Sequence, residues 1–221
     1  MSVVKDTFLH SLDLFFAKFK PLRYRKGEII LRAGEAPPGV LYLKRGFVRL
    51  YSISKQGEEL TLIIFKPGDF FPIMWAINNM PNNYFLESMT FCEICRVPRA
   101  VFLAFIRDNP DVLYEMTKRI MIRFAGLLSR MEYLVFGNAY AKVASILAIC
   151  AERFGRREKE GILVEVPLTH SDIATLVGVT RETASVEIKK IERKGLIAHK
   201  GRLLFVKNLR GLKRESLLDT L

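Results

Sequence analysis

The chain has few of the residues that bind metals and redox groups. Its 221 residues include 3 cysteines, 3 histidines and 1 tryptophan. No cysteine precedes Cys92, and no histidine lies between His10 and His170. That stretch therefore lacks a histidine ligand for haem and the two or three histidines of a carboxylate-histidine metal centre. We expect no metal ion and no cofactor.

One cysteine pair, Cys92-Glu93-Ile94-Cys95, has the spacing of redox and zinc sites. Only Cys150 remains beyond it, so one chain cannot assemble a four-thiolate cluster. The pair also lies in a β-like run, where alternation puts Cys92 and Cys95 on opposite strand faces. This is a poor geometry for chelation or for a disulfide. We interpret both cysteines as structural and leave open the oxidation of Cys150.

Long apolar runs and catalytic motifs are missing as well. No run approaches the roughly 18 apolar residues of a membrane-spanning helix, and the N-terminus has no basic region followed by an unbroken apolar core. The sequence contains no Walker loop and no nucleophile-base-acid constellation. We expect a cytoplasmic protein that has no membrane partner and is not an enzyme.

Positive charge, by contrast, is abundant. The formal net charge is +12 and the isoelectric point is near 9.8. Residues 138–221 hold 16 Lys and Arg against 10 Asp and Glu, so this shorter C-terminal part carries half of the net charge. Such a field attracts a polyanion, either a nucleic acid or an anionic membrane surface. Because no membrane anchor is present, a nucleic acid is favoured.

Residues 169–197 have the pattern of two short helices joined by a tight turn. Thr169 can cap the first helix, and Asp172 three residues later completes a capping-box-like pair. Gly178 supplies the backbone freedom that a sharp turn needs, and Thr180 begins the second helix. A solvated helical hairpin is the plain alternative, but the coincidence of spacing, turn glycine and polar face favours DNA binding.

The second helix indicates which side chains would face DNA. Ala184, Ile188 and Ile191 form an apolar stripe, so the polar residues between them point away from the protein. Arginine can donate to guanine, glutamate can accept from cytosine, and lysines meet phosphates. Two β-like runs around Lys200-Gly201-Arg202 follow, as in a winged helix-turn-helix. The predicted DNA-binding residues are Thr169, His170, Ser171, Thr180, Arg181, Glu182, Thr183, Ser185, Val186, Lys189, Lys190, Lys200 and Arg202.

The N-terminal half predicts strands that follow one helix and precede another. Apolar residues at helical spacing predict a helix over Thr7–Phe19. From Leu22 to Val97, short β-like runs alternate with Gly, Pro and Asn, which predicts an antiparallel β-roll. Pro98 then fits the first position of another helix. The clearest β-like runs are Glu28–Leu31, Val40–Leu43, Val48–Ile53 and Leu60–Phe65.

A longer helix is predicted from Pro110 to about Phe136. Along it, residues spaced alternately four and three apart form a heptad seam, which predicts a coiled-coil contact with a second copy of the chain. Packing of the helix against its own roll is the alternative. The predicted dimerisation residues are Leu113, Thr117, Ile120, Phe124, Leu127, Met131 and Leu134.

The expected fold class is α+β, with three parts. Residues 1–109 would form the N-terminal helix and β-roll, residues 110–136 the dimerisation helix, and residues 138–221 the winged helix-turn-helix domain. Gly137-Asn138 is the expected hinge. The tail, residues 208–221, is expected to close the last domain with a short helix.

Short motifs in both halves carry a family resemblance. The first half contains the glycine turns Lys26-Gly27-Glu28, Ala33-Gly34-Glu35 and Pro67-Gly68-Asp69-Phe70, and the second half contains Thr180-Arg181-Glu182-Thr183 and Lys194-Gly195-Leu196-Ile197. Together they resemble the catabolite activator and fumarate-nitrate reductase regulator (CRP/FNR) family of bacterial transcription factors.

The resemblance implies a cyclic-nucleotide-binding-like sensor roll of jelly-roll type and a homodimer that binds double-stranded DNA. Its two recognition helices would lie about one DNA turn apart and read an inverted repeat. RNA polymerase is a further expected partner if the protein is an activator.

The sequence departs from the cyclic-nucleotide-binding branch of that family at the ligand contacts. That branch has Gly-Glu after the Gly-Asp-Phe turn and Arg-Ser about ten residues later, where this chain has Pro72-Ile73 and about Asn82-Asn83. The glutamate accepts from the ribose and the arginine neutralises the phosphate. The hydroxyl residues that reach the purine align with Leu127 and Leu128. We therefore expect no binding of cyclic AMP and a different, unidentified signal.

The interior of the roll is expected to be apolar. Either its own side chains fill it, which we favour, or it is open to a hydrophobic or aromatic effector. A constitutive DNA-binding or architectural protein with a self-filled roll is the alternative function. The iron-sulfur branch of the family has an N-terminal cysteine cluster that this chain lacks. The candidate effector pocket is Phe70, Phe71, Ile73, Trp75, Asn82, Asn83, Tyr84, Leu127 and Leu128.

The second helix of the predicted helix-turn-helix also differs from the corresponding helix of relatives that have the Arg-Glu pair. Those relatives add an arginine one turn later, where Val186 stands here, so a guanine contact is lost. Glu187 occupies a core-facing position. Either the helix is slightly rotated, or Glu187 pairs with Lys190 or Lys194, of which Lys190 lies within reach. We expect a half-site with guanine opposite Arg181, cytosine opposite Glu182 and thymine near Val186 or Thr183.

Overall fold

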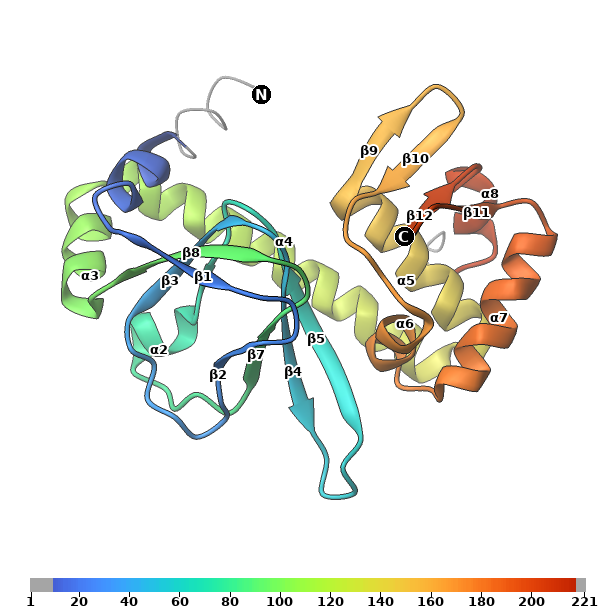
Figure 1. Ribbon diagram of the computed structural model, residues 1–221, viewed down its shortest axis with the longest axis horizontal. Coiled ribbons are helices and arrows are strands. Elements are labelled where there is room, and N and C mark those ends of the chain that lie inside the picture. Colours follow the sequence, from blue (N-terminus) through green and yellow to red (C-terminus); the bar gives the residue numbers. More distant parts are fainter. Residues whose placement is uncertain (1–9, 218–221) are drawn as a thin grey trace. The chain divides into compact units, whose positions relative to one another are not determined.

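The computed structural model describes residues 10–217 of the chain (Figure 1). Its internal contacts form two compact units. The first contains the residues up to Ser52 together with Leu62–Phe124, and the second contains Ile53–Thr61 and the residues from Ala125 onwards. Strand β5 (Glu59–Phe65) and helix α4 (Pro110–Phe136) each contribute residues to both units.

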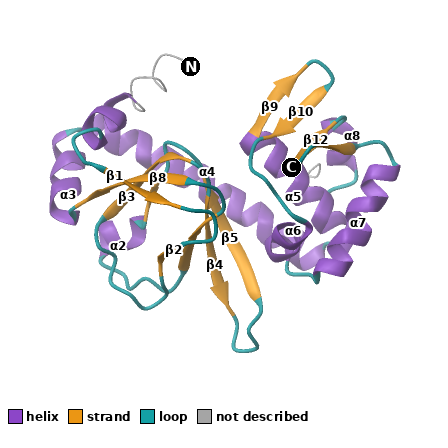
Figure 2. Ribbon diagram, in the orientation of Figure 1, coloured by secondary structure: helices purple, strands orange, loops and turns teal. Residues whose placement is uncertain are grey.

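The first unit is built around a β-roll of two sheets, drawn in orange in Figure 2. Each sheet is 4-stranded, in the orders β1-β8-β3-β6 and β2-β7-β4-β5. The four β-like runs named from the sequence are confirmed as strands β2 to β5, with ends that differ by no more than two residues. The remaining bounds are β1 Pro21–Tyr24, β2 Ile29–Leu31, β3 Val40–Arg45, β4 Val48–Ile53, β6 Phe70–Phe71, β7 Phe85–Ser88 and β8 Cys92–Val97.

A glycine makes the tight connection between β3 and β4. Gly46 has a φ of 94°, and a Cβ at this position would lie 2.3 Å from the carbonyl oxygen of Phe91. Any other residue would therefore strain the backbone and collide with the neighbouring strand. This connection carries the chain from one sheet to the other. The core between the sheets includes Leu41, Leu43, Val48, Leu50, Phe65, Phe71, Leu86 and Ile94.

The two cysteines of the C-x-x-C segment lie on opposite faces of β8, as predicted. Cys92 belongs to the core between the sheets, whereas Cys95 belongs to a second core beneath the helices. Both are free thiols, and burial raises the pKa of each. Cys150 is also free, and burial raises its pKa to about 12. Little reactive thiolate therefore forms at neutral pH.

Helices cover one sheet of the roll. The predicted helix over Thr7–Phe19 is observed as helical over residues 10–16, and Thr7 lies outside the described residues. Phe16 stacks on Tyr42 with ring centroids 4.3 Å apart, and the Tyr42 hydroxyl donates to Asp13 at 2.6 Å. These contacts fix the N-terminal segment on strand β3.

Two helix boundaries differ from the expectation. Pro98 precedes α3 (Arg99–Asp108) as its N-cap residue, so the prediction that Pro98 is the first helical residue is wrong by one position. Helix α2 (Ile73–Asn78) was not predicted, because a six-residue apolar segment does not display enough turns to reveal a helical period. Helix α4 has the predicted start and end.

The second unit is a small domain of helices and a 4-stranded sheet with the order β11-β12-β10-β9 (Figure 2). Its core contains Val143, Leu147, Ile173, Leu176, Ile188 and Ile191, all buried. The expected short helix of the tail is α8, whose N-cap Asn208 accepts from the amide of Gly211 at 2.8 Å. The bounds are α5 Ala139–Phe154, β9 Gly155–Glu158, β10 Gly161–Val164, α6 His170–Val177, α7 Arg181–Arg193, β11 Ile197–Lys200, β12 Leu203–Val206 and α8 Leu209–Arg214.

Candidate nucleic-acid interface

The first helix of the predicted pair, α6, begins with a complete capping box. The Thr169 hydroxyl accepts from the amide of Asp172 at 3.1 Å, and the Asp172 carboxylate accepts from the amide of Thr169 at 2.8 Å. At the other end Gly178 adopts a left-handed conformation with a φ of 65°, and its amide donates to Ala174. Both sequence predictions are confirmed, and this turn determines where the next helix begins.

Helix α7 has the predicted division between a buried stripe and an outward face. Ala184, Ile188 and Ile191 are each 0% exposed. Thr180 caps the helix by accepting from the amide of Thr183 at 3.2 Å. Because the stripe and the cap fix the rotation of the helix, its exposed side is defined. This side carries Arg181, Glu182, Val186, Lys189 and Lys190 as exposed residues and Ser185 as a partly exposed one.

The sequence left open whether Glu187 pairs with Lys190, pairs with Lys194 or marks a rotated helix, and the structure shows the pairing with Lys190. Its side chain is buried, and Lys190 donates to it at 2.9 Å. Lys194 instead donates to Glu215 at 2.7 Å, which ties the end of α7 to the tail. A carboxylate is thus accommodated in a core-facing position by a cation three residues away.

The predicted wing is present next to α7. Strands β11 and β12 form a hairpin whose turn holds Gly201 at a φ of 64°, and the turn residue Arg202 is exposed. Lys200 donates to Glu158 of β9 at 2.7 Å, a partner that lies 42 residues away and that the sequence did not reveal. The ion pair links the first and last strands of this sheet, β11 and β9.

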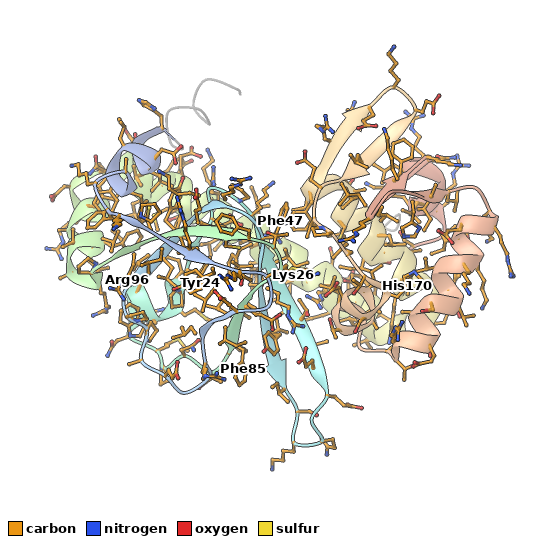
Figure 3. All side chains as sticks on the ribbon, in the orientation of Figure 1. Tyr24, Lys26, Phe47, Phe85, Arg96 and His170 are labelled. Carbon is orange, nitrogen blue, oxygen red and sulfur yellow. The ribbon has the colours of Figure 1, made fainter. Side chains whose placement is uncertain are left out.

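A histidine cluster at the edge of this face was only partly predicted. His170, labelled in Figure 3, is the first residue of α6. Its Nδ1 lies 2.8 Å from the Ser185 hydroxyl of α7. His199 was not predicted to be a site residue. Its ring centroid lies 6.3 Å from that of His170, and its Nδ1 lies 2.7 Å from Glu192. Burial, followed by the neighbouring His199 and the cations Arg181 and Lys189, lowers the pKa of His170.

The predicted seam of α4 is largely exposed in the single chain. Phe124 is 55% exposed and Leu127 is 49% exposed, whereas the residues of α4 that pack into cores are Val112, Met116 and Tyr133. The helix therefore contacts its own chain through a different side from the seam, which disfavours the alternative that the seam packs on the roll. The other seam residues are Leu113, Thr117, Ile120 and Met131, all exposed, and Leu134, which is partly exposed.

The residues of the candidate effector pocket do not all line one space. Phe71 packs in the core between the sheets, where it stacks on Phe65 at 4.5 Å, while Phe70 packs in the core beneath the helices. Asn82 is buried and donates to two backbone carbonyls, so its amide is used to hold a loop. Ile73 and Trp75 pack against the core of Phe70, Tyr84 packs against that of Phe71, and Asn83, Leu127 and Leu128 are exposed.

The aspartate of the Pro-Gly-Asp-Phe turn has a partner on α4 that sequence analysis missed. Asp69 is buried, and Arg123 donates to it. The carboxylate also accepts from the amide of Lys66 at 3.0 Å. The turn that borders the expected ligand site is thus fixed by the protein's own charges. Within residues 10–217, no helix is long and apolar enough to cross a membrane, and no three His, Cys, Asp or Glu residues are placed to hold a metal ion.

Comparison with known proteins identifies both units. Residues 21–109 match the model of the cyclic nucleotide-binding domain, and residues 141–215 match that of the Crp-like helix-turn-helix domain. The chain belongs to the CRP/FNR family. As a CRP/FNR protein it has the α+β fold predicted from its sequence, with a β-rich N-terminal domain, a long helix and a C-terminal helix-turn-helix domain.

Individual relatives align with the chain over most of their length, which supports this assignment. The chain is 29% identical over 179 residues to the transcriptional activatory protein AadR of Rhodopseudomonas palustris, covering 80% of this chain and 72% of that protein. It is 23% identical over 199 residues to the CRP-like cAMP-activated global transcriptional regulator of Mycobacterium tuberculosis, covering 90% and 89%. A CooA mutant structure from Carboxydothermus hydrogenoformans superposes with a TM-score of 0.74 at 27% identity, covering 90% and 88%. The first two of these relatives are transcription regulators by name.

Proposed function

We propose that this CRP/FNR-family protein is a sequence-specific DNA-binding transcription regulator that acts as a homodimer on an inverted repeat. The observation that carries the proposal is the capped α6–α7 pair, in which one side of α7 is buried and the other presents Arg181, Glu182 and Lys189 to solvent. A rigid helix with exposed hydrogen-bonding side chains near its N-terminus suits the major groove.

The exposed side chains divide by chemistry into base readers and phosphate contacts. Arg181 would donate to guanine and Glu182 would accept from cytosine, while Val186 or Thr183 would favour thymine. The hydroxyls and cations around them would meet phosphates. These phosphate contacts are Thr169, Ser171, Thr180, Lys189, Lys190, Lys200 and Arg202.

The proposed homodimer is supported by the seam of α4. Its apolar residues are spaced by heptads and exposed in the single chain, so a second copy would remove them from water. A two-fold axis along the seam would relate the two copies of α7 and make the target palindromic.

Replacing Arg181 by Ala is expected to weaken binding to the preferred site by about 1 to 3 kcal/mol and to relax the preference at one base pair. The reason is the loss of a donor that distinguishes guanine from the other bases. Binding titrations on the preferred duplex and on its three single-pair variants at the guanine position measure both effects. A uniform loss on all four duplexes would show that Arg181 contacts only the backbone.

Lys189→Ala serves as the matched control, because Lys189 is exposed on the same helix but stands where a phosphate contact is expected. Its loss should weaken binding to all duplexes alike and reduce the dependence of the affinity on salt by about one counterion. A change of base preference in this variant would reverse the two assignments.

We further propose that the signal sensed by the roll is not cyclic AMP. In support, Ile73, the first residue of helix α2, stands where the cyclic-nucleotide branch has its ribose-binding glutamate, and Phe71 fills the adjoining core. Asp69 already has the guanidinium of Arg123 as its partner. The filled core equally favours the second candidate function, a constitutive regulator whose roll binds no effector.

Addition of cyclic AMP is expected to change neither the melting temperature of the protein nor its affinity for DNA. A ligand that binds only the folded state at about 100 times its Kd would stabilise that state by about 2.7 kcal/mol, which thermal unfolding detects readily. Differential scanning calorimetry with cyclic AMP, and with AMP as the control, tests whether the melting temperature changes. A saturable rise in Tm with cyclic AMP alone would contradict the expectation.

A further inference from the structure

Two of the chain's 3 histidines meet beside the outward face of α7, and neither has been assigned a base or phosphate contact above. His170 lies on α6, His199 on β11 and Ser185 on α7, so three elements converge on one polar cluster. His170 is linked to the proposed recognition helix by the 2.8 Å contact between its Nδ1 and the Ser185 hydroxyl. Ser185 is partly exposed on the side that would face the bases.

The charges around His170 come from the elements packed against it. Helix α7 brings the cations Arg181 and Lys189 and the carboxylate of Glu192, and strand β11 brings His199. Glu192 is bonded to His199 at 2.7 Å, so its charge is directed mainly at the other ring. Burial and the cations together lower the pKa of His170, and the ring of the free protein is therefore mostly neutral at pH 7.

The direction of the bond between His170 and Ser185 depends on the proton content of the ring. A neutral imidazole has one donor and one acceptor nitrogen, so Nδ1 can either accept from the serine hydroxyl or donate to it. When the ring takes a second proton from solvent, both nitrogens are donors. Ser185 must then accept from Nδ1, and its own hydroxyl hydrogen is released from the bond.

We propose that His170 determines the hydrogen-bonding sense of Ser185, and that protonation of the ring frees the Ser185 hydroxyl to donate toward DNA and changes the preferred base at one position. This inference rests on the proposed function. In the major groove, guanine and thymine offer acceptors, while cytosine offers only its amino group as a donor. A serine whose hydrogen is bonded to an accepting Nδ1 can only accept, which favours cytosine, whereas a serine that accepts from the protonated ring can also donate to guanine or thymine.

DNA itself would favour the protonated ring. The phosphates provide a strong negative potential, which raises the pKa of a histidine in the complex above its value in the free protein. Binding then takes up a proton. The extra affinity is fully present below the pKa of the free protein and is lost as the pH rises through the pKa of the complex.

The test is selection of bound duplexes from a pool with a randomised half-site, carried out at pH 6 and at pH 8 and at constant salt. For the wild-type protein we expect cytosine to fall by about three- to tenfold relative to guanine and thymine at one position at pH 6, in keeping with the value of one hydrogen bond. His170→Gln, whose amide can donate and accept but does not titrate, should select the same sequences at both pH values.

Two further variants separate this mechanism from a general effect of charge. Ser185→Ala should lose the pH-dependent change of preference, and because it leaves the histidine in place it tests the link even if His170→Gln folds poorly. His199→Gln should keep the change. The proposal is overturned if wild type and His170→Gln shift alike, or if wild type selects one sequence at both pH values. If no sequence is enriched at either pH, the proposed function itself fails, and the inference with it.

Discussion

Replacing Phe124 by Glu in the seam of α4 is expected to convert the proposed homodimer to a monomer and to weaken binding to an inverted repeat by about 100-fold or more. Phe124 lies near the middle of the seam and is 55% exposed in the single chain. Across a two-fold axis, the substitution would place two carboxylates close together in an apolar contact, where burial of a charge is costly. Each monomer would then bind one half-site without the help of the other.

Ile122→Glu is the matched control. Ile122 lies on the same helix and is even more exposed, at 72%, but it stands outside the heptad seam on a different side of the helix. Sedimentation and fluorescence anisotropy on full-site and half-site duplexes measure assembly and affinity together. A Phe124→Glu protein that remains dimeric, or an Ile122→Glu protein that dissociates, would show that the dimer forms through another surface.

Arg130→Met is expected to reduce the free energy of unfolding by about 3 kcal/mol, since hydrogen bonds from charged groups and the burial of unsatisfied carbonyls each contribute on this scale. Arg130 is buried, and its Nη2 donates to the carbonyl oxygens of Thr61 at 2.6 Å and Leu176 at 2.5 Å. Leu176 lies in the last turn of α6, so the guanidinium also opposes the negative end of that helix. A methionine retains most of the apolar stem but leaves both carbonyls without this donor.

The same guanidinium joins three segments of the second unit. Helix α4 carries Arg130, the residues before Leu62 supply Thr61, and α6 supplies Leu176. The Thr61 hydroxyl also lies 2.9 Å from that of Thr175 on α6. Arg130→Lys, which preserves the charge and one or two donors, should lose less than Arg130→Met in urea unfolding. Equal stability of wild type and Arg130→Met would mean that the bonds are replaced by water at no cost.

Elements whose signals are local in the sequence could be predicted. The capping box of Thr169 and Asp172, the left-handed Gly178 and the buried stripe of α7 depend on residues within a few positions of each other, and each is confirmed. Helix α4 was predictable for the same reason, because 27 residues contain enough turns to reveal a heptad.

Features that depend on distant contacts could not be predicted. Arg130 stands beside exposed seam residues and by its type alone would be assigned to solvent, yet it is buried because Thr61, 69 residues earlier, lies against it. The adjacent Phe70 and Phe71 were assigned to one pocket from the sequence, but they enter different cores because they point to opposite faces of the sheet that contains β6. The pairing of His170 with Ser185 likewise requires the turn between α6 and α7 to be folded.

The measurement that most directly tests the central claim is selection of bound sequences from a random duplex pool by the purified protein, without added ligand and at physiological salt, since the affinity depends steeply on salt. The account predicts enrichment of an inverted repeat, with half-sites about one DNA turn apart that contain a guanine and a cytosine read by Arg181 and Glu182. Failure of a folded, dimeric protein to enrich any sequence would contradict it.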